Sequence, residues 1–246
     1  GVVVIVIVVI VIGIGLFIGP IIKTAVEAVG PKILKASIKV EAVSVSALTG
    51  SASVKGLIVG NPEGFKTPHL VKLGSVSVGL DPFSVFSKKI VIRSMHIIAP
   101  EFTYEGGLGG NNISKTMDNI NAATGAGKNG ASAESEKGKT EQKIEIDDFL
   151  IKDAKVKVFI SGLSSKEVTV PLPDIHLTNL GKESDGVTPA ELIQTVFAKV
   201  SKSTVAAVTQ TVTASGKILK DIGKDVGSKA SESFKSITKD LKGLFQ

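Results

Sequence analysis

The chain has 246 residues, of which 43% are hydrophobic, and 29 basic residues against 23 acidic ones give a formal net charge of +6. It contains no cysteine, which excludes disulfides, thiol nucleophiles and thiolate metal sites. Tryptophan is absent and aromatic residues make up only 4%, so the aromatic-and-basic interleaving of RNA-binding surfaces is missing and no nucleic acid partner is expected. The positive charge instead favours an anionic membrane surface.

The first segment, residues 1–22, has no charged or hydrogen-bonding side chain and ends at Lys23. About 20 apolar residues suffice for a helix to cross the hydrocarbon core of a bilayer. The segment is therefore predicted to be a single transmembrane anchor that leaves the rest of the chain outside the membrane. Gly15 and Gly19 form a GxxxG pair, whose small residues let membrane helices approach closely, so packing of two anchors into a homo-oligomer is a further hypothesis.

Residues 23–186 show the pattern of a β-sheet domain. After a short helical stretch around residues 25–34, apolar residues alternate with polar ones, as in the run from Ser75 to Leu80. The parity of this alternation changes near Ala42, which predicts a β-bulge there. Turn signals such as Asn61-Pro62-Glu63-Gly64 and Asp81-Pro82 separate the strands. We expect a mainly β fold with some α: a curved antiparallel meander sheet with one apolar face.

The stretch 106–143 interrupts this pattern and is predicted to be a flexible insert, because it is rich in Gly, Asn, Ser and Ala. The run Gly125-Ala126-Gly127-Lys128 does not make a phosphate-binding loop. The first glycine of that motif would fall on Ala122, and Asn129 stands where Ser or Thr is needed.

No catalytic constellation is predicted. His69, His96 and His176 are scattered without metal-ligand spacing, so no metal or cofactor is expected. Asp174 lies close to His176, but Ser, His and Asp occur together by chance in most β proteins. We expect the protein not to be an enzyme.

Residues 187–246 are predicted to form a long amphipathic helical region. Thr188, Pro189 and Glu191 have the pattern of a capping box that starts a helix. Further along, apolar residues recur every eleven positions, as at Val208, Leu219, Ala230 and Leu241, which keeps the apolar stripe straight along a helix. Two alternatives stay open: the stripe lies in a lipid interface, or it packs on the apolar face of the sheet.

The order of these segments resembles that of a short member of the AsmA-like family of bacterial envelope proteins. Three stretches carry the resemblance, Ser44–Phe65, Leu73–Glu105 and Gly109–Ile120, and it covers roughly residues 1–180. It lies in the order N-P-x-G-F, a D-P-x-S turn, an I-x-I-x-x-P-x-x-x-x-E strand and then G-x-N-N. The resemblance implies a single-pass inner-membrane protein with the bulk of the chain in the periplasm, and a curved sheet with an apolar groove. Larger members are implicated in phospholipid movement between membranes.

The functional hypothesis is a non-enzymatic, membrane-anchored protein that binds membrane lipid or helps to transfer it. Acyl chains would lie in an apolar groove of the sheet, driven by about 0.8 kcal/mol per buried CH₂ group. The predicted lining residues are Val76, Val78, Leu80, Ile90, Ile92, Val156, Val158, Val168 and Val170. The alternative is a structural or scaffold protein of the envelope that self-assembles, or meets other envelope proteins, through its anchor, sheet edges and long helix.

Overall fold

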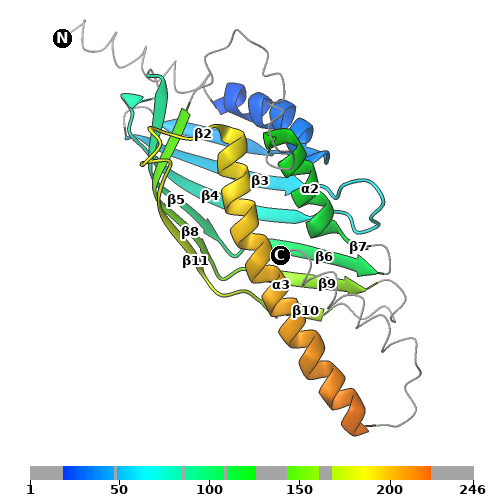
Figure 1. The fold of residues 1–246 in the computed structure, drawn as a ribbon. Coiled ribbons are helices and arrows are strands. Elements are labelled where there is room, and N and C mark those ends of the chain that lie inside the picture. The colour runs from blue at the N-terminus through cyan, green and yellow to red at the C-terminus, as the bar shows by residue number, and fades with distance from the viewer. Residues whose placement is uncertain are drawn as a thin grey trace, which may run out of the picture.

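The computed structural model describes residues 19–46, 49–84, 87–107, 110–125, 143–160 and 168–222. Within these ranges the chain is mixed α and β, with three helices and one large, mostly antiparallel sheet (Figure 1). After a helix over residues 19–34, the elements are β1 (Ile38–Lys39), β2 (Ala42–Ser46), β3 (Ser51–Val59), β4 (Val71–Leu80), β5 (Lys89–Ile98), β6 (Glu101–Gly107), β7 (Gly110–Asn111), α2 (Asn112–Thr124), β8 (Lys143–Lys152), β9 (Lys155–Ile160), β10 (Val168–Pro171), β11 (Ile175–Leu180) and α3 (Pro189–Ile222).

Most of these strands are halves of longer ones. β1 and β2 pair with β3 in one continuous register, β5 and β6 both pair with β4, and β8 and β9 continue one another beside β5 and β6. β10 and β11 likewise share one register against β9 and β8. Six long strands therefore lie side by side in chain order, as the meander prediction requires.

One junction differs from the predicted antiparallel meander. β8 runs parallel to β5, and β9 runs parallel to β6. Parallel neighbours need a crossover that returns the chain to the starting end of the sheet. Residues 108–142, which include α2, supply that crossover, so this part of the expected insert 106–143 has an architectural role. Residues 126–142 of the insert lie outside the described residues.

The breaks between the half-strands line up across the sheet. The register on both sides places six residues in one row: Glu41, Gly56, Gly74, Ala99, Asp153 and Pro173. Gly56, Ala99 and Asp153 have φ of 60°, 52° and 55°, which lies outside the β region. On every strand, the inward-facing side chains next to this row are at even-numbered positions on one side of it and at odd-numbered positions on the other. The apolar face therefore continues across the row. The parity change predicted near Ala42 is the first member of this row, but it is not the predicted β-bulge, because the register of β1 and β2 against β3 continues through it without an extra residue.

α2 and α3 cover one face of the sheet, called here the inner face, and the first helix runs along the edge strand β1–β2 (Figure 1). Phe102, Val156 and Ile175 from the strands share one core cluster with Ile120 of α2 and Val208 of α3. α2 begins where the Asn111 side chain accepts a hydrogen bond from the Ser114 amide at 2.8 Å and ends at Gly125 in the left-handed conformation. The opposite, outer face carries none of the described helices.

Each lateral edge of the sheet is protected from further strand pairing. On one side, the Val40 amide of the edge strand donates to the Glu27 carboxylate of the first helix at 2.8 Å. On the other side, the edge strand β10–β11 contains Pro171 and Pro173, which carry no amide hydrogen. These edges are therefore poor templates for the edge-to-edge assembly of the scaffold alternative.

The predicted anchor falls mostly on residues 1–18, outside the described residues, and Gly15 lies there too. Among the helices of the described part, none is both long and apolar enough to span a membrane. Residues 19–22 belong to the first helix, and a Cβ added at Gly19 would stand 2.2 Å from the Val43 carbonyl oxygen. Gly19 thus allows close contact between this helix and β2. Its predicted contact with a second anchor stays a prediction.

The predicted start of the last helix is confirmed. The Glu191 amide donates to the Thr188 hydroxyl at 3.2 Å, and the Thr188 amide donates to the Glu191 carboxylate at 2.8 Å, which completes the capping box. α3 continues to Ile222 and packs on α2 and on the inner face of the sheet. Residues 223–246, which carry the rest of the eleven-residue repeat, lie outside the described residues.

Candidate functional site

The residues predicted to line a groove lie mostly in the core beneath the helices. Val156 and Val158 are 0% and 5% exposed, and Ile92 and Val170 are also buried in the cluster that contains α2 and α3 residues. Val78, Leu80 and Ile90 are half-buried against this cluster, and Val76 is buried. Val168, at the start of β10, is exposed. Most of these side chains thus pack against other protein side chains, several of them from α2 and α3, so an acyl chain that took over these contacts would displace a helix.

α3, which covers part of the inner face, has two buried hydroxyl groups without hydrogen-bond partners. Its Ser201 and Thr204 side chains are 5% and 0% exposed, and their hydroxyl oxygens have no hydrogen-bond partner. A buried polar group without a partner costs about 1–3 kcal/mol relative to its hydrated state. Docking of α3 therefore combines a favourable burial of Val200, Val205 and Val208 with a penalty for two hydroxyls. Undocking removes that penalty.

Within the described residues, one side-chain hydrogen bond joins α3 to α2. The Gln194 side-chain amide donates to the Asn121 side-chain oxygen at 2.9 Å. The other α3 side-chain hydrogen bonds found in the described residues stay within the helix or its cap. The contact between α3 and the rest of the fold is thus mainly apolar, a kind of surface that lipid acyl chains can replace.

The sequence motifs that carry the family resemblance meet in a buried polar network. The Glu105 carboxylate accepts hydrogen bonds from the Lys66 and Thr67 amides and, at 2.6 Å, from the Thr67 hydroxyl. The Asn112 side chain donates to Asn61 and accepts from the Glu105 amide, both within 2.9 Å. The loop that follows β3 is thereby fastened to β6 and to the start of α2. These residues have a structural role in the described fold.

The charge of Glu105 is stabilised by this network. Burial raises the pKa of the Glu105 carboxyl, but the hydrogen bonds from the Thr67 hydroxyl and the Lys66 and Thr67 amides outweigh burial and hold the pKa below its usual range. The carboxylate is therefore ionised at neutral pH although it is 6% exposed. Nothing in this arrangement leaves it free to transfer a proton to a substrate.

Two of the three scattered histidines meet on the outer face. His96 of β5 and His176 of β11 each place Nε2 on Asp148 of β8, at 2.8 Å from Oδ2 and 2.5 Å from Oδ1. The hydrogen bonds from His96 and His176 lower the pKa of the Asp148 carboxyl. Sequence reasoning missed this cluster because it depends on the parallel pairing of β5 with β8. In the described part of the chain no group of His, Asp and Glu has metal-binding geometry.

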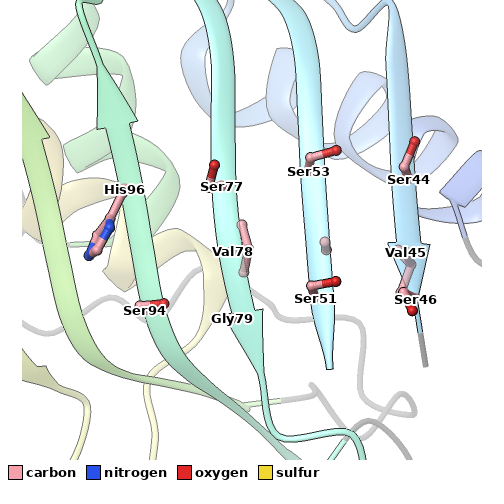
Figure 2. Close-up of a pocket in the computed structure, with 11 residues that line it drawn as sticks. Ser44, Val45, Ser46, Ser51, Ser53, Ser77, Val78, Gly79, Ser94 and His96 are labelled. Atoms are coloured by element: carbon pink, nitrogen blue, oxygen red, sulfur yellow. The ribbon is translucent and has the colours of Figure 1, made fainter. Parts of the chain in front are cut away.

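The outer face also has a hollow lined by serines, with a volume of about 500 Å³. Figure 2 shows Ser44, Ser53 and Ser77 in one row across β2, β3 and β4, with His96 of β5 next in that row. The neighbouring inner-facing residues on these strands are valines, such as Val76. Six serines and His96 make up most of its lining, and of the nine predicted groove residues only Val78 is among the residues that line this hollow.

A comparison with known protein families places the whole sheet and α3 in one unit. The model described as the AsmA family matches residues 36–222. Neither a curated protein nor a solved structure matches the chain.

Proposed function

Because this chain belongs to the AsmA family, which supports a membrane-associated envelope protein, we propose that it is a non-enzymatic lipid-handling protein whose inner sheet face takes up acyl chains when α3 undocks. The observation that carries the proposal is the cover itself: an apolar sheet face beneath a helix with two buried, unpartnered hydroxyls. The residues that line the groove are the nine named from the sequence.

The proposed mechanism exchanges one set of apolar contacts for another. When α3 leaves, Val200, Val205 and Val208 lose their burial, while Ser201 and Thr204 regain hydration. An acyl chain then restores apolar contact on the sheet at about 0.8 kcal/mol per buried CH₂ group. The proposed location is the bacterial inner membrane, with residues 1–18 as the core of a single-pass anchor and the sheet in the periplasm.

A tether between α3 and α2 tests this mechanism. The chain has no cysteine, so the double variant Asn121→Cys/Gln194→Cys provides two unique thiols at a side-chain contact. A short bismaleimide would bridge them and hold α3 down. The matched control is the same variant blocked with two molecules of N-ethylmaleimide, which modifies both thiols without bridging them.

The readout is the phospholipid bound per chain, measured by native mass spectrometry after incubation with phospholipid vesicles. We expect the bridged protein to take up several-fold less lipid than the blocked control. Equal uptake would show that α3 does not gate the site. Stable oligomers that carry no lipid in either sample would favour the scaffold alternative instead.

A further inference from the structure

A second hollow, of about 630 Å³, opens between the first helix and the sheet. Lys39, Ile58 and Lys72 are cross-strand partners on β1, β3 and β4 and share the outer face, since the alternate residue Val59 is buried inward. Lys23 approaches from the first helix. Gly74, in the aligned row, has no atom within 4 Å of an added Cβ and leaves open space, whereas at Gly56 the Glu41 carboxylate lies 2.5 Å from the position of an added Cβ.

The lysines of this hollow have no carboxylate partner. In the described part of the chain, no ion pair within 4.0 Å involves Lys23, Lys39 or Lys72. Lys23 Nζ donates only to the Glu41 backbone carbonyl, at 3.2 Å. Of the two acidic residues that line the hollow, Glu27 already accepts the Val40 amide at 2.8 Å, and Glu41 is the other. Three lysines and two glutamates thus line one hollow, a net charge of +1, and in the described residues these lysines form no ion pair.

One apolar side chain of the lining shares the outer face with these lysines. Ile58 of β3 lies between Lys39 and Lys72 as their cross-strand partner. An isoleucine between two lysines is typical of a surface that meets the boundary between lipid headgroups and acyl chains. Free inorganic phosphate would use the ammonium groups but not this apolar side chain.

We propose that this hollow binds the phosphate of an anionic phospholipid headgroup, with Lys23, Lys39 and Lys72 as its donors and Ile58 against the start of the acyl chains. The site deepens the proposed function, on which it rests, because it gives a lipid a place on the outer side of the sheet next to the helix that follows the predicted anchor. Lysine binds phosphate as a point charge, and several such charges act together.

Lysine acylation of the full chain in detergent tests the site. A soluble probe, dihexanoyl phosphatidic acid, is added in increasing concentration, and protection of Lys23 from an amine-reactive ester is followed by mass spectrometry. Lys23 is the reporter in every variant. We expect Lys39→Gln/Lys72→Gln to raise the half-protecting concentration about tenfold. The control Lys152→Gln/Lys155→Gln changes two exposed lysines elsewhere on the sheet and should leave that concentration unchanged.

Two results would overturn the site as a headgroup site. One is that the probe does not protect Lys23, or protects it equally in both double variants. The other is that inorganic phosphate at the same concentration protects Lys23 as well as the lipid does, which would assign the hollow to a free anion. The lysine substitutions leave the inner face unchanged. The outcome of this experiment is therefore independent of the lipid-uptake experiment with the bridged and blocked proteins, which tests the proposed function.

Discussion

On β9, Val156 is completely buried while the preceding Lys155 is exposed; on β4, Val76 is buried between the exposed Ser75 and Ser77. This alternation separates an inner face that makes the core with α2 and α3 from an outer face that carries serines, lysines and histidines. Much of the inner face packs against protein side chains, and the outer face of the described residues holds two hollows. In the proposed mechanism, α3 and an acyl chain would compete for the inner face, while the headgroup would lie on the outer face.

The difference between the two faces is tested most directly by introducing a carboxylate on each face of one strand. Val156→Asp buries a carboxylate without a partner, and we expect it to lower the free energy of unfolding by about 4 kcal/mol or more. Lys155→Asp, one residue away on the outer face, should change it by less than about 1 kcal/mol. Urea denaturation of both variants measures the difference. Equal losses would mean that the two faces are not distinct.

Glu105 is the exception that sharpens the comparison, because it is a buried carboxylate with a full set of donors. Glu105→Gln places an NH₂ group among the Lys66 and Thr67 amides, and we expect a loss of about 3 kcal/mol at neutral pH. The pKa of Glu105 is lowered in the folded protein, so its contribution is present above about pH 4.3 and is lost as the pH falls through the lower folded pKa.

The stability difference between the wild type and Glu105→Gln should therefore shrink as the pH drops below about 4. Thermal unfolding across this pH range measures it. A difference that stays constant down to pH 3 would contradict a role for the ionised carboxylate, since only packing would then separate the two proteins.

The next feature to test is the row from Glu41 to Pro173, at which the inward-facing positions of each strand change. Gly56 has φ of 60°, and an added Cβ would lie 2.5 Å from a Glu41 carboxylate oxygen, so Gly56→Ala should cost about 1–2 kcal/mol. Gly74 is its neighbour across the strands and has nothing within 4 Å of an added Cβ. Gly74→Ala should be close to neutral by chemical denaturation. Similar costs at both glycines would show that the strain does not lie at Gly56.

The smallest effect is expected on the outer face. Asp148→Asn removes the charge that His96 and His176 share, but all three side chains are well exposed, so solvent screens the interaction. We expect a drop in Tm smaller than that of Glu105→Gln. The folded pKa of Asp148 is also lowered, so the drop should disappear at acidic pH as the wild-type carboxylate becomes protonated. A larger drop than that of Glu105→Gln would make this cluster a main fastening of the sheet.

Local patterns in the sequence predicted the local structure well. The capping box of Thr188 and Glu191, the first helix and the parity change near Ala42 each depend on neighbouring residues, and each is present. The AsmA resemblance, drawn from the spacing of turn and strand motifs, is confirmed by the family match.

Features that depend on distant parts of the chain were not predicted. The parallel pairing of β5 with β8 follows from the path of the crossover, which alternation of side chains does not specify. The cluster of His96, Asp148 and His176 and the network around Glu105 both depend on such pairings. The nine groove residues were placed on one apolar face from their period, but the period does not tell which helix covers that face.

The parallel pairing also has a consequence for folding kinetics. The first three long strands are joined by connections of at most eleven residues, so they form contacts that are close in the sequence, whereas β5 meets β8 only after a loop of more than 40 residues has closed. Closing such a loop costs entropy before any contact compensates for it, and non-local strand pairing slows folding. Until β8 arrives, β5 and β6 form an unpaired edge beside an uncovered apolar face. Slow refolding should therefore be accompanied by concentration-dependent aggregation, because this intermediate exposes both surfaces at once.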